Sequence, residues 1–389
     1  MTPKPLRSND IRERNEKLVL QLIYSHAGLS QSKVAQLTGL KPPTVFRIFS
    51  QLEEQGLIRE CSENAERTER KGRKPSYYCV TPDSFYAIGV DFWSAGAAVL
   101  LVDFAGNAVH QAVIEFDAGI GAGEVLRRIE ELVQQALAVG IDPERVLGIG
   151  VGAPGIVDIS AGSVMRYPRI SGIEEYNIKA ELEERFGLPV SVHNNASVVA
   201  LSEYRYGQVR EEASALAFLL RTGVGGAFVQ NGQVFVNREM TAMEIGHMQV
   251  ERNGKQCECG AKGCLETYLS EDVILEELRL RAGTETLTQA AEQLESGDEA
   301  VEETLSEFGD ILGDAALSLA NILNPEAFLI VSRFRAISTL FAERVTARLR
   351  GPGHTYGQAP ARVVAEEYDT VTACKGATDL VFDAFFALR

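Results

Sequence analysis

One short segment of the 389-residue chain constrains its folding more than any other. It spaces four metal-binding residues in the pattern H-x9-C-x-C-x4-C, namely His247, Cys257, Cys259 and Cys264. Gly260 and Gly263 lie between the last two cysteines, so the loop can turn back and bring the sulfur atoms together. Three thiolates and one imidazole, with no open position, are typical donors of a tetrahedral structural zinc ion. The alternative, unrelated buried thiols, requires a chance cluster of three cysteines, so we predict Zn²⁺ as a structural cofactor.

The other cysteines and the apolar segments indicate the compartment. Cys61, Cys79 and Cys374 are scattered, and we expect them to be small hydrophobic residues. This usage favours a metal and reduced thiols over a secreted disulfide framework. The first ten residues have no apolar core of a signal peptide, and the Gly-rich stretch 147–157 is too short to cross a bilayer. We expect a soluble cytoplasmic protein that does not bind membranes.

Charge is divided unevenly along the chain. Residues 1–80 hold 14 Lys and Arg against 9 Asp and Glu, whereas the remaining residues hold 24 against 45. The overall charge of −16 therefore combines a head of +5 with a body of −21. A polyphosphate is attracted to such a head and repelled by such a body. The split indicates a nucleic-acid module fused to another domain, with random variation along the chain as the alternative.

The head has the pattern of a winged helix-turn-helix. One-face apolar spacing predicts a first helix over 10–27. Ser30 is a good N-cap for a short second helix, and Gly39 is placed to end it. Pro42 is tolerated in the first turn of a third helix, which needs no amide donor there.

One face of this third helix is expected to contact DNA. Its apolar residues recur at i, i+3, i+4 and i+7, and they are Val45, Ile48, Phe49 and Leu52. The outward residues, on the face that a recognition helix presses into the major groove, are Lys41, Thr44, Arg47 and Gln51. Two strand-like runs, 57–59 and 77–80, then enclose a polar segment in which Arg73 and Lys74 predict a basic wing. Any three-helix unit can share the apolar spacing, but the turn, the basic face and the wing together favour DNA binding by residues 1–80.

The body alternates strands and helices. Apolar runs at 87–91, 97–103, 146–151 and 190–193 predict strands, and the spacing over 124–138 and 178–186 predicts helices. This alternation indicates an α/β fold with ligands at strand ends. It does not distinguish a Rossmann fold from an actin-like or sugar-kinase fold.

Two further features point to a ligand. Gly223, Gly225 and Gly226 allow a turn to bring backbone amides close to an anion, although glycine-rich hairpins are common without one. Glu244 stands three residues before His247, and Glu266 stands two after Cys264. A zinc ion that fixes the histidine would therefore fix two carboxylates, which with an imidazole suit sugar hydroxyls. The alternative is that both glutamates are solvated surface charges.

These motifs together resemble the ROK family of repressors, open reading frames and sugar kinases over nearly the whole chain. The resemblance is carried by the segments TGVGGA (222–227), EIGH (244–247), CECGAKGCLE (257–266), GAPG (152–155) and VHNNA (192–196). It implies a two-lobed, actin-like or sugar-kinase-like body of the ribonuclease H-like type. The first lobe would span 81–200 and be completed by 370–389, and the second would span 201–369. By motif position, the sugar site would consist of Asn194, Asn195, Glu244, His247 and Glu266.

Several departures separate the chain from the kinases of that family. Asn195 stands where they carry an aspartate base, and an amide loses a base contribution of about 10²–10⁴-fold. Trp93, within 91–95, stands in what should be a glycine-rich phosphate turn. Ser332-Arg333, after a predicted strand over 327–331, replaces a glycine pair near the adenosine site. Met243, where the family usually has glycine, would place a large side chain near the sugar.

The chain thus looks like the ROK transcriptional repressors that answer to xylose, N-acetylglucosamine or glucose. We expect a sequence-specific DNA-binding regulator without enzymatic activity, whose kinase-like body binds a sugar or sugar derivative. Its partners would be operator DNA, the sugar and further copies of itself in a homodimer or homotetramer. The alternatives are a bifunctional ATP-dependent sugar kinase with a DNA-binding head, and a regulator whose body serves only dimerisation.

Overall fold

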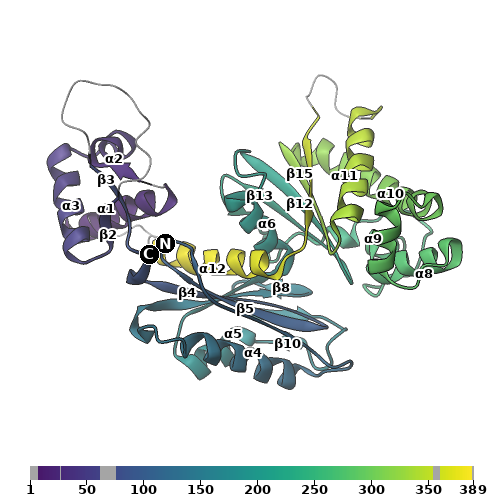
Figure 1. Cartoon of the computed structure of the whole chain (residues 1–389), viewed down its shortest axis with the longest axis horizontal. Helices are drawn as coiled ribbons and strands as arrows, with labels where there is room; N and C mark the ends of the chain where they lie inside the picture. Colours follow the sequence, from purple (N-terminus) through teal and green to yellow (C-terminus); the bar gives the residue numbers. More distant parts are fainter. Residues whose placement is uncertain (1–7, 27, 62–75, 354–359, 388–389) are drawn as a thin grey trace.

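The chain folds into a small head and two α/β lobes, and the C-terminal helix lies where they meet (Figure 1). This computed structural model describes residues 8–26, 28–61, 76–353 and 360–387. Over these ranges, no helix has both the length and the apolarity that crossing a membrane requires.

Three helices build the head: α1 (Ser8–Ser25), α2 (Gln31–Thr38) and α3 (Pro42–Glu54). The Ser30 hydroxyl accepts a hydrogen bond from the Lys33 amide at 3.3 Å, which satisfies one of the donors that a helix leaves free at its start. Gly39 has a φ of 70° and ends α2, as its position predicts. The four predicted apolar residues of α3 are buried. The predicted helix-turn-helix is therefore confirmed.

A three-stranded sheet follows the helices. β2 (Ile58–Cys61) and β3 (Tyr77–Val80) form the antiparallel hairpin at the base of the wing, and β1 (Leu29–Ser30) pairs with the other edge of β3. Arg73 and Lys74, the basic residues predicted for the wing, lie outside the described residues.

The hairpin corrects one prediction. Cys61 lies opposite Tyr77 and Cys79 opposite Arg59, so the two cysteines are diagonal neighbours across the strands. Their Cα atoms are 5.9 Å apart and a disulfide joins them. The expectation that they are scattered hydrophobic residues is wrong, because the two cysteines stand 18 positions apart in the chain and only the hairpin brings them together.

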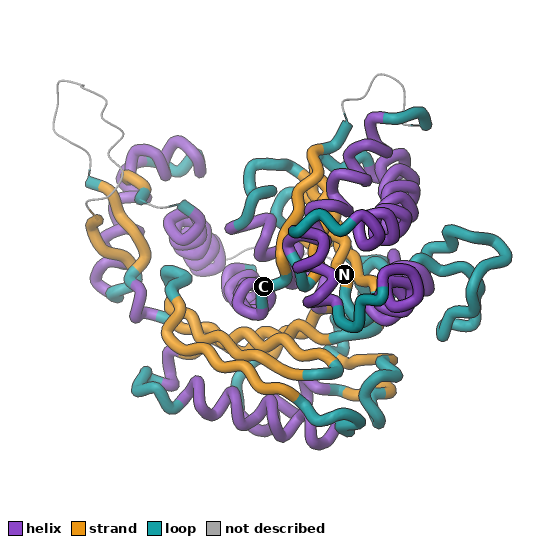
Figure 2. The backbone as a smooth tube through the Cα atoms, turned by 45° about the vertical axis from the view of Figure 1, so that its right-hand side comes forward, coloured by secondary structure: helices purple, strands orange, loops and turns teal. Residues whose placement is uncertain are grey.

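The first lobe is a five-stranded mixed sheet in the order β11-β7-β4-β5-β6. Its strands are β4 (Tyr86–Trp93), β5 (Gly96–Asp103), β6 (Ala108–Glu115), β7 (Val146–Ala153) and β11 (Val190–Asn194). Helices α4 (Ala122–Leu137) and α5 (Ile178–Phe186) cover one face, and α12 (Thr370–Phe386) covers the other (Figures 1 and 2). A small sheet of β8 (Ile156–Asp158), β9 (Ser163–Arg166) and β10 (Glu174–Tyr176) adjoins it. The sequence pattern missed β6, whose side chains alternate between half-buried and exposed.

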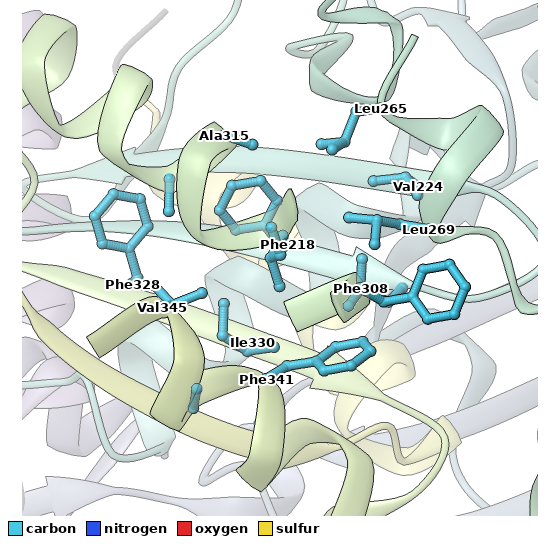
Figure 3. Close-up of a cluster of buried hydrophobic side chains, with 14 of the residues drawn as sticks. Phe218, Val224, Leu265, Leu269, Phe308, Ala315, Phe328, Ile330, Phe341 and Val345 are labelled. Atoms are coloured by element: carbon cyan, nitrogen blue, oxygen red, sulfur yellow. The ribbon is translucent and has the colours of Figure 1, made fainter. Parts of the chain in front are cut away.

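The second lobe has a five-stranded sheet in the order β14-β13-β12-β15-β16. Its strands are β12 (Ser214–Leu220), β13 (Val224–Gln230), β14 (Gln233–Val234), β15 (Ala327–Ser332) and β16 (Arg362–Glu367). The helices of this lobe are α7 (Glu266–Leu269), α8 (Glu271–Ala282), α9 (Leu287–Glu295), α10 (Glu299–Leu323) and α11 (Arg335–Arg350). Phe218, Phe328 and Phe341 lie in the core between the sheet and these helices (Figure 3). The long apolar face of α10 accounts for much of this core.

Helix α6 (Asn195–Tyr206) connects the lobes. It packs against β7 and β11 of the first sheet and against β12 and β13 of the second. It also crosses α12 so closely that a Cβ atom on Gly376 would lie 1.8 Å from the Val198 carbonyl oxygen. Position 201, where the sequence places the start of the second lobe, lies inside this helix. The two helices are therefore in close backbone contact at the lobe junction.

The head shares a hydrophobic core with the body. The Tyr24 ring of α1 lies 5.3 Å from the Phe104 ring after β5, and 5.1 and 5.2 Å from the Phe382 and Phe386 rings of α12. Val19 of α1 belongs to the same buried cluster. The head and α12 are thus packed together through a shared aromatic core.

Candidate functional site

An open cleft lies between the lobes. The residues predicted for the sugar site come from separate segments and all line this cleft: Asn194, Asn195, Glu244, His247 and Glu266. Cys259 of the predicted metal site also lines it. The fold therefore places the metal loop and the carboxylates at one wall of a single cleft.

The four predicted metal ligands meet at this wall. Their donor atoms all lie within 4.8 Å of one another. The Cys257 Sγ is 3.6 Å from the His247 Nδ1, and the Cys259 Sγ is 3.6 Å from the Cys264 Sγ. Tetrahedral ligands at about 2.3 Å (sulfur) and about 2.1 Å (nitrogen) from zinc are roughly 3.5–3.8 Å apart. The donor set and its spacing fit a zinc ion.

The local sequence folds the loop into this shape. Gly263 has a φ of 70°, and a Cβ atom there would lie 1.6 Å from the Glu251 carbonyl oxygen, so only glycine fits. The Cys257 amide donates to the Ala261 carbonyl at 2.9 Å and closes the turn. Burial raises the pKa of the Cys264 thiol to about 12, whereas the Ala261 amide lowers the pKa of Cys259. A divalent cation would stabilise the thiolate forms that burial disfavours.

Two carboxylates stand beside this loop. Glu244 precedes the single helical turn Ile245–His247, and Glu266 begins α7. Glu244 is exposed to the cleft, yet the surrounding walls displace bulk water and, together with the charge of Glu266, raise its pKa to about 7. Glu244 is exposed but lines the cleft, and Glu266 is half-buried with a backbone partner.

Glu266 also explains the glycine-rich turn. Its Oε2 atom accepts a hydrogen bond from the Val224 amide at 3.1 Å, and a Cβ atom on Gly223 would lie 2.6 Å from the same oxygen. The anion that this turn holds in the structure is thus a carboxylate of the protein itself.

The two asparagines sit at the start of α6. The Asn194 Oδ1 accepts a hydrogen bond from the Ala196 amide at 2.8 Å, and its Nδ2 donates to the Gly155 carbonyl at 2.7 Å. Asn194 therefore caps the helix and ties it to the GAPG segment. Asn195 is half-buried and lines the cleft.

An arginine occupies the other end of the cleft. The Arg221 guanidinium lies 4.9 Å from the Trp93 ring and 4.0 Å from the Tyr368 ring, between the two aromatic side chains. Tyr368 donates a hydrogen bond to Asp91 beneath them. Burial raises the pKa of Asp91 to about 6, although Arg221 and Tyr368 both oppose the shift. Bulky side chains therefore fill the region where the sequence predicts a missing phosphate turn.

Two arginines that the sequence reading missed join the lobes across the cleft. The Arg169 Nη2 donates to the Thr222 carbonyl at 2.6 Å, and its Nη1 lies 3.1 Å from the Asp272 carboxylate. Arg166 donates to the Glu258 carbonyl in the metal loop at 3.3 Å. The available signal was the run Arg-Tyr-Pro-Arg at 166–169, which places two cations around a turn after β9.

Of two expectations about positions where the chain departs from the ROK pattern, the structure contradicts the one for Met243 and agrees with the one for Ser332-Arg333. Met243 packs against the core of the second lobe and does not line the cleft, so the expected large side chain near the sugar is wrong. At the end of β15, the Ser332 hydroxyl donates to the Phe334 carbonyl at 3.0 Å and Arg333 pairs with Glu271, so side chains occupy the position of the expected glycine pair.

The residues predicted to contact DNA differ in their exposure and in their hydrogen-bond partners within the head. Lys41 and Arg47 are exposed and Thr44 is half-buried. Gln51 is engaged within the head, because its amide accepts a hydrogen bond from Arg12 at 2.7 Å and donates to Glu16 at 3.1 Å. Of the four, Lys41 and Arg47 are the most accessible to a partner.

Comparison with known proteins agrees with this arrangement. The chain is 24% identical over 350 residues to the xylose repressor of Caldicellulosiruptor bescii, which covers 86% of this chain and 87% of that protein. It is 27% identical over 335 residues to the DNA-binding transcriptional dual regulator NagC of Escherichia coli, with coverage of 82% and 80%.

Solved structures share the fold. A ROK family transcriptional regulator described as a homologue of the Escherichia coli MLC protein superposes with a TM-score of 0.79, at 23% identity over 97% of this chain and 98% of that chain. A ROK family glucokinase from Streptomyces griseus, in complex with glucose and AMPPNP, superposes with a TM-score of 0.66, at 26% identity over 76% and 98%.

Family signatures cover both parts of the chain. The signature of a winged helix-turn-helix DNA-binding module matches residues 12–59. The signature of the ROK family matches residues 87–384, which include the lobes, the cleft and the cysteine loop. The chain belongs to the ROK family.

Proposed function

We propose that this protein is a DNA-binding transcriptional regulator, and specifically a repressor, whose kinase-like body senses a sugar or sugar derivative. The observation that carries the proposal is the path of α6, which begins at Asn195 in the cleft and ends at Tyr206 beside the head. A xylose repressor and the dual regulator NagC among its relatives support a role in transcription regulation, and the first supports repression. A family fold alone supports kinase and repressor equally, so the proposal depends on these particular residues.

The DNA interface is the exposed face of α3 and the basic wing. Lys41 and Arg47 supply positive charge at the groove, and Thr44 lies beside them. Arg73 and Lys74 are proposed as wing contacts from the sequence alone. Recognition helices place such residues in the major groove, while wing cations contact phosphates or the minor groove.

The sugar site is the wall of the cleft formed by Glu244, Glu266 and His247, with Asn194 and Asn195 opposite. Carboxylates accept hydrogen bonds from sugar hydroxyls, and the Asn195 amide can both donate and accept. The Nδ1 atom of His247 faces Cys257. A metal on that nitrogen leaves the Nε2–H available to donate to a hydroxyl in the cleft.

Zinc is the proposed structural cofactor. His247, Cys257, Cys259 and Cys264 would hold it with no open position, so it would contribute rigidity and no chemistry of its own. Because His247 and Cys259 also line the cleft, fixing the loop fixes one wall of the sugar site.

The body transmits ligand binding to the head through α6 and α12. Tyr206, at the end of α6, donates a hydrogen bond to the Asp379 carboxylate of α12 at 2.7 Å. Arg205 lies 3.1 Å from Asp379 and 2.7 Å from Asp383. Burial raises the pKa of Tyr24 in the head, while the neighbouring Tyr206 hydroxyl lowers it, so the two tyrosines lie together.

A ligand that prefers one arrangement of the lobes therefore shifts the position of the head. In a symmetric oligomer, this displacement changes the separation of paired recognition helices from the spacing of the half-sites on DNA. We propose a homodimer or homotetramer on this ground.

Loss of phosphotransfer accompanies this function. Asn195 cannot accept a proton from a sugar hydroxyl, and Arg221 with Trp93 fills the end of the cleft. The alternative is a bifunctional sugar kinase, which the structural likeness to a ROK glucokinase favours. A body that serves only dimerisation is a further alternative, and the cleft with its converging polar groups argues against it.

A thermal-melt panel distinguishes these functions. The purified, zinc-loaded chain is heated with many sugars, each with and without magnesium ATP, because any ligand of the folded state raises the melting temperature. The proposal predicts a shift with a sugar and none with ATP. A shift with ATP, followed by sugar-dependent ATP turnover, favours the kinase, and no shift with any sugar favours the dimerisation body.

Operator binding tests the head. Arg47→Ala is expected to weaken binding to a selected operator by roughly 5- to 100-fold, the usual range for one base contact, while the sugar-induced melting shift stays unchanged. Lys262→Gln, an exposed cation on the metal loop, is the control. Equal operator affinity for the wild type and Arg47→Ala would refute the assignment of α3 as the recognition helix.

A further inference from the structure

Phe46 is an exposed aromatic residue on the helix that faces DNA. Its side chain is 62% exposed, although the neighbouring residues Val45 and Phe49 are buried. Successive helical residues are rotated by about 100°, so Phe46 points away from the core that anchors α3.

The surroundings of Phe46 form a continuous outer stripe. Pro42 and Pro43 lie one turn before it and Ser50 one turn after it, and all three are exposed. Arg47 is adjacent and exposed, so a cation flanks the ring. Single exposed apolar residues are common on protein surfaces, but this one lies on the recognition helix α3, directly before the exposed Arg47.

The chemistry of the ring restricts what it can contact on DNA. A phenyl group has no hydrogen-bond donor or acceptor, so it cannot bind phosphates or the polar edges of bases. The apolar group that base pairs present in the major groove is the C5-methyl of thymine. We propose that Phe46 is a specificity-determining residue that packs against thymine methyl groups of the operator and selects A·T pairs at those positions.

This inference rests on the proposed DNA-binding function and adds to it the base that is read. It assigns complementary tasks on one helix, since Arg47 supplies charge and hydrogen bonds while Phe46 supplies apolar contact. Phe46 was not among the residues that the sequence pattern places outward on α3.

The test uses the full, zinc-loaded chain and an operator selected from random duplexes. Each thymidine of the operator is replaced singly by deoxyuridine, which removes only the methyl group, and affinity is measured by fluorescence anisotropy. The wild type is expected to lose about 4-fold in affinity per contacted methyl at one or two thymines of each half-site. Phe46→Ala is expected to bind the parent operator about 10-fold more weakly than the wild type does. The variant should bind the parent operator and the duplexes with deoxyuridine at those positions with equal affinity.

Leu18→Ala is the matched control, because Leu18 is an exposed apolar residue of the head that lies on α1 (39% exposed). It is expected to retain full discrimination between thymidine and deoxyuridine. Wild-type affinity that is unchanged at every thymine overturns the inference while leaving the DNA-binding function intact. A Phe46→Ala variant that still discriminates, or that changes oligomeric state without altering discrimination, also overturns it. Failure of the chain to select any sequence overturns the proposed function and this inference together.

Discussion

Cys259 is the exposed member of the metal cluster, so it is the ligand that can be changed with least damage to the core. Cys259→Ser is expected to lower zinc affinity by at least about 100-fold, since loss of a ligand exceeds the 10- to 100-fold loss usual for a supporting group. The sugar-induced melting shift should fall with it, because Cys259 and His247 line the cleft.

Zinc per chain, measured by elemental mass spectrometry, and the melting shift check this prediction. Lys262→Gln, on the same loop but outside the cluster, should retain both. A Cys259→Ser variant that keeps zinc and sugar affinity would show that the cluster does not form the proposed site.

At the residue scale, sequence patterns identified groups with local spacing and missed groups that meet only in the fold. The cysteine loop was readable because its ligands lie within 18 residues, from His247 to Cys264. Arg169 was not, because its partners Thr222 and Asp272 lie in the other lobe. Phe46 was missed because it belongs neither to the apolar face at i, i+3, i+4 and i+7 nor to the polar residues assigned outward.

The wing hairpin is stabilised by a disulfide in addition to its packing. The Cys61–Cys79 disulfide closes a loop across β2 and β3, and such a closure typically stabilises a fold by about 2–4 kcal/mol. Reduction with a phosphine, or the double variant Cys61→Ser/Cys79→Ser, is expected to lower the free energy of unfolding of the head by that amount.

Hydrogen exchange of the amides in β2 and β3 measures this change, and intact mass reports the oxidation state. The reductant should have no further effect on hairpin protection in the double variant. Equal protection in the oxidised, reduced and doubly substituted chains would contradict the prediction.

Helix α12 carries a buried carboxylate whose titration affects stability. Burial raises the pKa of Asp379 to about 6, although Arg205 opposes the shift. Because the folded-state pKa exceeds the unfolded value of 3.8, the folded state binds the proton more tightly. The stability that this group contributes is therefore full below about pH 4 and is lost as pH rises through 6.

Asp379→Asn isolates this contribution. The free energy of unfolding of the wild type, relative to the variant, should increase as pH falls from 7 to 5. Urea denaturation at pH 5, 6 and 7, with both proteins zinc-loaded, measures the difference. A difference that is constant or that decreases toward pH 5 would contradict the pKa assignment.

At the element scale, local patterns predicted the three helices of the head and several strands and helices of the first lobe, including the cap at Ser30 and helix α5 over Ile178–Phe186. The helices α8 to α11 of the second lobe were not predicted. It missed β6, an edge strand that lacks a continuous apolar run. It also placed a lobe boundary inside α6, because no local signal marks a helix that packs on both sheets.

For the whole molecule, we propose that ligand binding in the cleft is coupled to the position of the DNA-binding head. Helix α6 starts at Asn195 in the cleft, it contacts α12 closely at Gly376, and α12 ends among the aromatic rings that pack on Tyr24. Coupling of this kind is reciprocal, so the factor by which a sugar changes operator affinity equals the factor by which the operator changes sugar affinity.

The most direct test is the operator affinity of the full, zinc-loaded chain, measured by fluorescence anisotropy without and with a saturating concentration of the sugar that raises its melting temperature. Coupling between the cleft and the head predicts that the sugar weakens operator binding by about 5- to 150-fold, with no requirement for ATP. A sugar that stabilises the body while leaving operator affinity unchanged would contradict the claim that the cleft controls the head.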